Sequence, residues 1–85
     1  MPAVVLVGHH HACPVCGPVT IASGSGSFTI NGRAVARAGD ALSCGAVIIS
    51  GSPSMIVDGQ PVARVGDSTD HDGELENGDR SWLID

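Results

Sequence analysis

Cysteine and histidine side chains carry most of the chemistry that this sequence could perform. The chain has three cysteines and four histidines, with one dense stretch near its start and two isolated members further along: His9, His10, His11, Cys13 and Cys16, then Cys44 and His71. Thiolate and imidazole groups are preferred ligands of zinc, and four of them complete a tetrahedral site. The residue types therefore indicate a metal site.

The spacing of these residues relates three separate loops. Five residues after a glycine comes a cysteine or histidine in each loop, at Cys13, Cys44 and His71. A second alignment instead sets Cys16-Gly17 against Cys44-Gly45 and His71-Asp72. Either alignment places one ligand type at the same point of each loop, so three similar loops that meet at one end would bring three ligands together.

The fourth ligand should come from the dense stretch. In an extended segment His9, His11 and Cys13 share one face while His10 points away. The segment from Cys13 to Cys16 could also place both of its sulfurs on the metal, with the spacing of a zinc knuckle. We expect the metal ligands to be His11, Cys16, Cys44 and His71, with Cys13 and His9 as alternatives.

Four protein ligands leave no open position for a reacting water, so we expect a structural zinc, with iron less favoured. The competing interpretation is a small metal-handling or thiol redox protein that uses Cys13 and Cys16. A redox motif of this kind normally opens a helix beside a βαβ pattern, which this sequence lacks. No nucleophile elbow, phosphate-binding glycine loop or zinc-protease helix is present, so we expect no enzymatic activity.

The elements that must position these loops are repeated. A shift of 27 residues aligns residues 35–40 (Val-Ala-Arg-Ala-Gly-Asp) with residues 62–67 (Val-Ala-Arg-Val-Gly-Asp), and a further shift aligns Asp58 with Asp85. Each copy alternates like a strand, turns, and returns. Its turn is Asn31-Gly32 or Asp58-Gly59, pairs that suit a type I′ hairpin. These patterns predict an all-β fold, with Arg37–Asp40 and Arg64–Asp67 pairing locally.

The third copy ends where its turn should begin, and residues 3–8 have the spacing of its missing return strand. We therefore expect the N- and C-terminal strands to pair and close a body with approximate three-fold symmetry. The expected organisation is a single domain, residues 1–85, with units at residues 17–31 with 3–8, 34–58 and 61–85. The end opposite the metal would present Asn31, Gly32, Asp58, Gly59 and the joined termini to a partner.

Composition limits the alternatives. The 85 residues form a thin core at best, with only Phe28 and Trp82 as aromatics. Four arginines, no lysine and nine acidic residues give a formal charge of −5, which argues against nucleic acid or anionic membrane as a partner. No apolar run is long enough for a membrane span, and the first residues lack the features of a signal peptide.

The repeats resemble a known family. Residues 34–37 (Ala-Val-Ala-Arg) and 61–64 (Pro-Val-Ala-Arg), each followed by x-Gly-Asp, resemble the Pro-Ala-Ala-Arg (PAAR) repeats of bacterial contractile injection systems, although Ala34 replaces the usual proline. Residues 8–14 (Gly-His-His-His-Ala-Cys-Pro) resemble the amino-terminal histidine motif of that family.

This resemblance implies a small cone that sharpens the valine-glycine repeat spike trimer of a type VI secretion system or a related phage tail. It implies a zinc ion near the vertex, held by three histidines and one cysteine. Because Cys16 stands where a histidine is expected, we expect a Cys2His2 site here. The resemblance also implies assembly in the bacterial cytoplasm, one tip per spike trimer, and delivery with the spike and its effectors. The repeats occupy the whole chain, so we expect a stand-alone tip.

Overall fold

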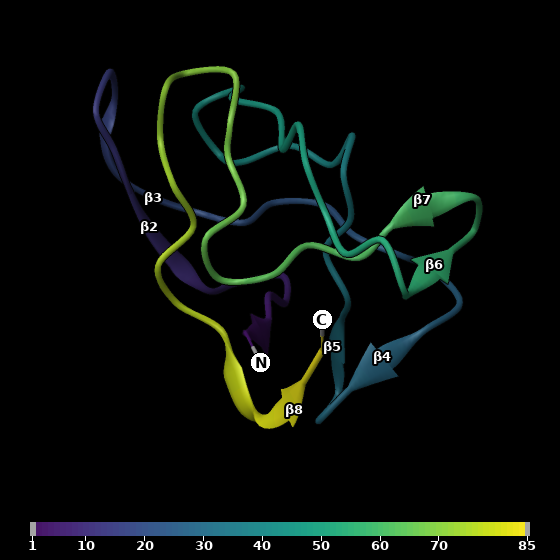
Figure 1. Ribbon diagram of the computed structural model, residues 1–85. Coiled ribbons are helices and arrows are strands. Elements are labelled where there is room, and N and C mark those ends of the chain that lie inside the picture. Colours follow the sequence, from purple (N-terminus) through teal and green to yellow (C-terminus); the bar gives the residue numbers. More distant parts are fainter. Residues whose placement is uncertain (1, 85) are drawn as a thin grey trace.

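Short β-strands and tight turns make up residues 2–84, which are the residues that the computed structural model describes (Figure 1). The strands within this range are β1 (Ala3–Val4), β2 (His10–Cys13), β3 (Gly17–Thr20), β4 (Thr29–Ile30), β5 (Arg33–Ala34), β6 (Ile56–Val57), β7 (Gln60–Pro61) and β8 (Asp79–Leu83). They pair antiparallel as β1 with β8, β2 with β3, β4 with β5, and β6 with β7. The all-β prediction is confirmed. Residues 2–84 contain no helix of a length and apolarity that would cross a membrane.

Two of the hairpins close through the expected turns. Between β4 and β5, Asn31 and Gly32 have φ angles of 53° and 78°. Between β6 and β7, Asp58 and Gly59 have φ angles of 53° and 80°. Positive φ at both central residues defines the type I′ turn, whose twist matches that of the flanking strands. The prediction from the Asn-Gly and Asp-Gly pairs is confirmed.

The strands nearest the two ends of the chain pair with each other. Strand β1 pairs antiparallel with β8, with Ala3 opposite Leu83, and the Ile84 N–H donates to the Pro2 carbonyl at 2.9 Å. Pairing of the terminal strands is therefore as predicted, whereas the expected correspondence of Asp58 with Asp85 lies outside the described residues. Pairing the end strands with each other leaves fewer exposed sheet edges.

A ring of three backbone hydrogen bonds links the units at their centre. The Val5 N–H donates to the Ala63 carbonyl at 3.0 Å, the Ala63 N–H to the Ala36 carbonyl at 2.8 Å, and the Ala36 N–H to the Val5 carbonyl at 2.9 Å. All three residues are fully buried. Each of the three residues donates to one of the other two and accepts from the other, so the three hydrogen bonds form a closed ring.

Two small cores lie on either side of this ring. Successive residues of a strand point to opposite faces, so Val4, Val35 and Val62 belong to one core, and their neighbours Val5, Ala36 and Ala63 to the other. The first core also contains residues of the hairpins and termini: Leu6, Ile30 and Ile84. The second contains residues of the three loops: Ile21, Leu42, Ala46, Ile48 and Leu75. The second core is therefore the base on which the loops stand.

Each loop begins at a turn stabilised by one side chain. The Asp40 carboxylate accepts the Arg37 backbone N–H at 2.8 Å and the Arg37 guanidinium at 3.1 Å. Arg64 and Asp67 repeat this arrangement, with a guanidinium–carboxylate distance of 3.1 Å, so the predicted local pairs are confirmed. In the first unit the His9 Nδ1 takes the role of the aspartate and accepts the Leu6 N–H at 3.0 Å.

We predict that Asp58 stabilises the contact between two units in a pH-dependent way. Its carboxylate accepts hydrogen bonds from the hydroxyls of Ser25 and Ser27 at 2.8 Å and 3.0 Å, and these, together with the Arg37 guanidinium, lower its pKa. A lowered pKa in the folded state stabilises the fold above the unfolded pKa of about 3.9, and this contribution disappears as the pH falls through the folded pKa.

Asp58→Ala should therefore lower the melting temperature at pH 7, and the difference from the parent chain should shrink below about pH 4. Asp58→Asn is the matched control, because asparagine occupies the equivalent turn position at Asn31 and keeps one acceptor oxygen. Its deficit at pH 7 should be smaller than that of Asp58→Ala, and it should also shrink as the parent carboxylate is protonated. Thermal unfolding followed by circular dichroism across pH 3 to 7 measures both. An Asp58→Ala deficit that persisted unchanged at low pH would contradict this role of the carboxylate.

Candidate metal centre

Three cysteines and one histidine converge at the ends of the loops. The ligand atoms of Cys13, Cys16, Cys44 and His71 all lie within 4.8 Å of one another. The His71 Nδ1 atom is 3.6 Å from the sulfur of Cys13, 3.8 Å from that of Cys16 and 3.9 Å from that of Cys44. The loops that carry these residues rise to the upper part of Figure 1, away from β4, β5 and β8.

These distances fit a tetrahedral metal ion. Zinc binds cysteine sulfur at about 2.3 Å and histidine nitrogen at about 2.0–2.1 Å, and tetrahedral angles then separate the two ligand atoms by about 3.6 Å. The three nitrogen–sulfur distances are equal to this value or slightly longer. The donor set suits zinc, and the same ligands also serve iron. With four protein ligands, such a site is structural.

The backbone explains why three of the ligands are equivalent. Cys16, Cys44 and His71 are each followed by a residue with positive φ: Gly17 at 85°, Gly45 at 89° and Asp72 at 63°. Glycine adopts this conformation without strain, and aspartate tolerates it better than most residues. Of the two alignments considered from the sequence, the one that equates these three residues therefore matches the structure.

Cys13 joins the group from β2. The register of β2 and β3 sets Cys13 opposite Gly17, which places its sulfur at the turn that carries Cys16. Burial opposes its ionisation, but backbone N–H groups of Cys16 and Val15 donate to the sulfur, and the pKa of the Cys13 thiol is lowered to about 7. A hydrogen bond with the Cys44 thiol, and burial, raise the pKa of Cys16 to about 11. Metal binding must therefore displace thiol protons, as it does whenever cysteines become ligands.

His11 is not a member of this group, which consists of three cysteines and one histidine, so the structure brings together three of the four expected ligands, with Cys13 beside them. His11 and Cys13 do share the inward face of β2, as predicted, but two residues along a strand are separated by about 6.6 Å, so only Cys13 reaches the cluster. The His11 side chain is instead buried beneath it, with neither ring nitrogen hydrogen-bonded among the described residues. Its Nδ1 lies 4.0 Å from the Glu76 carboxylate.

The other two histidines also lie outside the group. His9 was considered as an alternative ligand, but its Nδ1 atom accepts the hydrogen bond from the Leu6 N–H. His10 is exposed on the outer face of β2, as predicted. The segment from Cys13 to Cys16 forms the turn between β2 and β3, and strand β3 follows it, whereas a catalytic thiol redox motif normally opens a helix.

We predict that His11 and Cys13 respond differently to substitution. His11→Leu removes two buried nitrogens that make no hydrogen bond among the described residues and replaces the ring with an apolar side chain of similar size, so the variant should retain one bound zinc per chain. Cys13→Ser removes a ligand and should weaken zinc binding by at least about tenfold. Competition with a chromogenic chelator, with zinc content measured by elemental analysis, compares the two. Zinc lost from His11→Leu and retained by Cys13→Ser would reverse the assignment.

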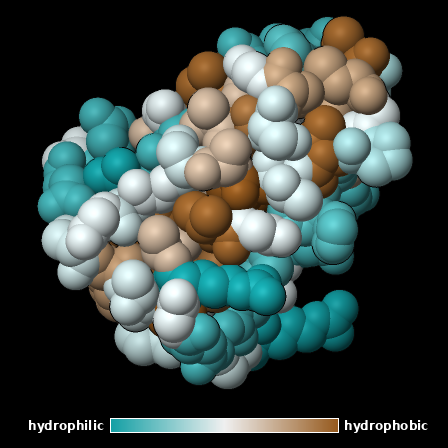
Figure 2. Space-filling view, turned by 180° about the vertical axis from the view of Figure 1, so that it is seen from behind, coloured by the Kyte–Doolittle hydropathy of each residue, from teal (hydrophilic) through white to brown (hydrophobic). Residues whose placement is uncertain are grey.

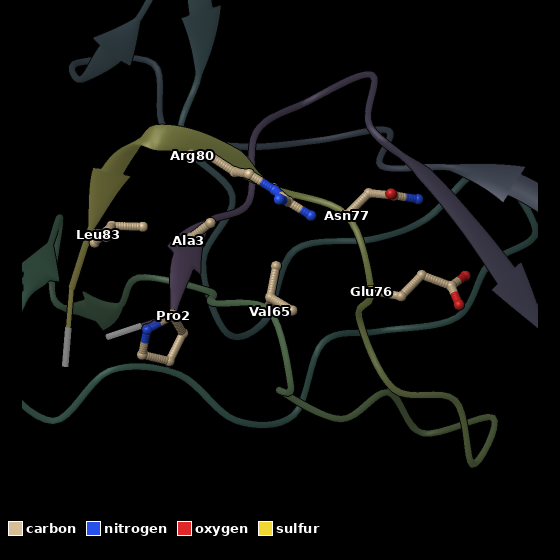
Figure 3. A pocket seen from close by; sticks show the side chains of 8 residues that line it. Pro2, Ala3, Val65, Glu76, Asn77, Arg80 and Leu83 are labelled. Atoms are coloured by element: carbon tan, nitrogen blue, oxygen red, sulfur yellow. The ribbon is translucent and has the colours of Figure 1, made fainter.

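We call Cys13, Cys16, Cys44 and His71 the metal group. A pocket of about 380 Å³ lies beside the paired strands β1 and β8, and none of its lining residues belongs to the metal group (Figure 3). The pocket is lined by Pro2, Ala3, Val65, Glu76, Asn77, Gly78, Arg80 and Leu83. In Figure 3 the Arg80 side chain extends toward Asn77, whereas the Glu76 carboxylate points away. The lining thus brings together no nucleophile with a base.

The sequence was compared with models of known protein families, and one family matches. The family described as PAAR motif matches residues 1–50 and 47–77, which together cover most of the chain. The chain belongs to the PAAR motif family. No curated protein matches it. In this PAAR motif protein, residues 37–40 and 64–67 of the repeats form the turns that start the second and third loops.

Proposed function

We propose that this PAAR motif protein is the metal-stabilised tip of a trimeric β-helical spike, the valine-glycine repeat spike of a type VI secretion system or a phage-tail-like machine. One tip would cap one trimer and sharpen it for penetration of an envelope. The observation that carries the proposal is the closed ring of hydrogen bonds among Val5, Ala36 and Ala63. It gives a single chain an approximate three-fold axis, with the metal group at one end.

The base is the surface suited to the spike. We define it as the turns Asn31-Gly32 and Asp58-Gly59, with their hairpins, and the paired terminal strands. In Figure 1 these elements lie toward the lower and right-hand side, away from the metal loops. A monomer with such symmetry can match the end of a trimer contact for contact. Strands added to the end of a β-helical trimer would also satisfy its unpaired backbone groups.

Apolar side chains are available at this base. Ile56 of β6 is 56% exposed and Leu83 of β8 is 49% exposed, although most of the large apolar residues are buried. These two positions are related by the 27-residue shift, which makes Thr29 of β4 their counterpart in the first unit. Figure 2 shows that apolar patches on the face seen from behind are interrupted by polar ones.

The metal group suits a mechanical and non-enzymatic role. A tip that is driven through an envelope must keep its loops folded, and the apolar core on which these loops stand is small. A metal that bridges Cys13, Cys16, Cys44 and His71 would resist the local opening of each loop. We propose that the protein is assembled with its spike in the bacterial cytoplasm and leaves the cell with the spike and any bound effectors.

The test is to mix the zinc-loaded chain with a trimeric β-helical spike tip and measure the mass of the complex by light scattering during size-exclusion chromatography. We expect one chain per trimer. Ile56→Asp should weaken binding at least tenfold, whereas Val15→Asp is the matched control, because Val15 is 69% exposed but lies between the metal ligands Cys13 and Cys16. Equal binding by both variants, or no complex with any spike, would contradict the proposed base contact.

A further inference from the structure

The metal group contains three sulfurs of unequal accessibility. Cys13 is 3% exposed, Cys44 is half-buried, and Cys16 is exposed at the end of the β2–β3 hairpin. The neighbouring Val15 is 69% exposed, so the turn that carries Cys16 projects into solvent. Cysteines bind metal as thiolates, the form of sulfur that reacts with oxidants. In the metal-loaded chain, exposure therefore decides which sulfur an oxidant meets first.

We propose that Cys13 and Cys16 are an oxidation site: a peroxide joins them in a disulfide, and the metal is released. The ligand atoms of the group lie within 4.8 Å of one another, so a modest movement brings two sulfurs together. Once they are joined, only Cys44 and His71 remain as ligands. Two ligands hold a metal far more weakly than four do.

The structure favours Cys13 over Cys44 as the partner of Cys16. Cys13 and Cys16 belong to one hairpin, and only the turn at residues 14–16 must move to bring their sulfurs together. Cys44 lies in a separate loop that is tied by its own backbone, with the Leu42 N–H donating to Ala46 at 2.8 Å and the Gly45 N–H donating to Leu42 at 3.0 Å. A bond to Cys44 would have to displace one loop against another.

The chemistry balances with one peroxide. The Cys16 thiolate attacks one peroxide oxygen, the O–O bond breaks, and the sulfur becomes a sulfenic acid while the other oxygen leaves as hydroxide and takes up a proton. The Cys13 sulfur then attacks the Cys16 sulfur, the S–O bond breaks, and a second hydroxide leaves and is protonated. Two thiols are oxidised to one disulfide, and the peroxide is reduced to two waters.

Such a site would make the tip sensitive to its compartment. Thiols stay reduced in a cytosol, and disulfides persist outside it. The metal would then hold the loops during assembly and be lost after delivery, a consequence that rests on the proposed function. The oxidation chemistry itself does not depend on the spike, and its test uses the chain alone.

The first measurement treats the zinc-loaded chain with hydrogen peroxide in the presence of a chromogenic zinc dye. We expect one zinc to be released per chain, and the mass of the metal-free chain to be two hydrogen atoms lower than that of the reduced chain. Addition of a thiol reductant and zinc should restore both the mass and the metal content. The matched control removes zinc with a chelator under reducing conditions, after which zinc alone should restore the site. Zinc retained after the thiols are oxidised would overturn the proposal.

The second measurement identifies the bond. The chain has four arginines and no lysine, so trypsin leaves Cys13 and Cys16 in peptide 1–33 and Cys44 in peptide 38–64. We expect an internally bridged peptide 1–33 and a free thiol in peptide 38–64. Cys44→Ser should give the same bridged peptide, and Cys16→Ser should not. Peptides 1–33 and 38–64 joined to each other would overturn the assignment of the pair. Failure to bind any spike would leave these outcomes unchanged and would count only against the proposed function.

Discussion

Alanine at Cys44 or His71 is expected to abolish tight metal binding and to unfold the isolated domain or lower its melting temperature by roughly 10 °C or more. Among the described residues, each of these two is the only member of the cysteine–histidine group that its loop contributes. Structural zinc contributes about 10–16 kcal/mol of apparent folding free energy in small zinc domains, which is comparable to the whole stability of a typical domain. The loss should therefore be much larger than that of an ordinary side-chain contact.

His10→Ala is the matched control for these two substitutions. His10 is exposed on β2 and is not part of the metal group, although it lies only three residues from Cys13. This variant should keep one zinc and the melting temperature of the parent chain. Calorimetry of each variant with and without a chelator, combined with elemental analysis, makes the comparison. If Cys44→Ala stayed metal-free and fully stable, the metal group would have no structural role.

Much of the fold could be predicted from local sequence patterns, namely the turn pairs and the missing return strand of the third copy. Asn31-Gly32 and Asp58-Gly59 specify hairpins because few other residue pairs tolerate positive φ at both turn positions. Pairing of β1 with β8 followed from the missing third return strand. The ring through Val5, Ala36 and Ala63 could not be predicted in detail, because backbone hydrogen bonds between distant units leave no residue-specific signature.

The ligand set shows where sequence reasoning reached its limit. Cys16, Cys44 and His71, which occupy equivalent loop positions, were expected as ligands and do lie together in the structure. The fourth depended on which inward-facing residue of β2 lies nearest the turn, and strand alternation alone treats His11 and Cys13 alike. The register of β2 with β3 sets Cys13 opposite Gly17, next to the turn, and sets His11 opposite Val19, farther from it. The knuckle spacing of Cys13 and Cys16 was the signal that favoured this result.

A second large loss of stability is expected on substitution of any of three glycines spaced 27 residues apart, because another segment of backbone lies close to each of them. A Cβ atom would lie 2.7 Å from the Val35 carbonyl oxygen at Gly24, 2.7 Å from the Pro61 carbonyl oxygen at Gly51, and 2.8 Å from the Val4 carbonyl oxygen at Gly78. These oxygens belong to backbone that cannot move aside as a flexible side chain would. The repeat therefore requires glycine at this position, because the backbone at each of the three glycines lies directly against the backbone of another segment.

Gly51→Ala should destabilise the domain by about 1–3 kcal/mol, which corresponds to roughly 4–8 °C in melting temperature for each kcal/mol in a chain of this size. Gly26→Ala is the matched control, because a Cβ atom there would meet nothing within 4 Å. It should leave stability unchanged or raise it slightly, since alanine restricts the unfolded chain. Thermal unfolding of both variants in the zinc-loaded state separates the effect of packing from loss of metal. Equal stability of the two variants would mean that the segments at Gly51 and Pro61 can separate without cost, and the close crossing would then not be what selects glycine in the repeat.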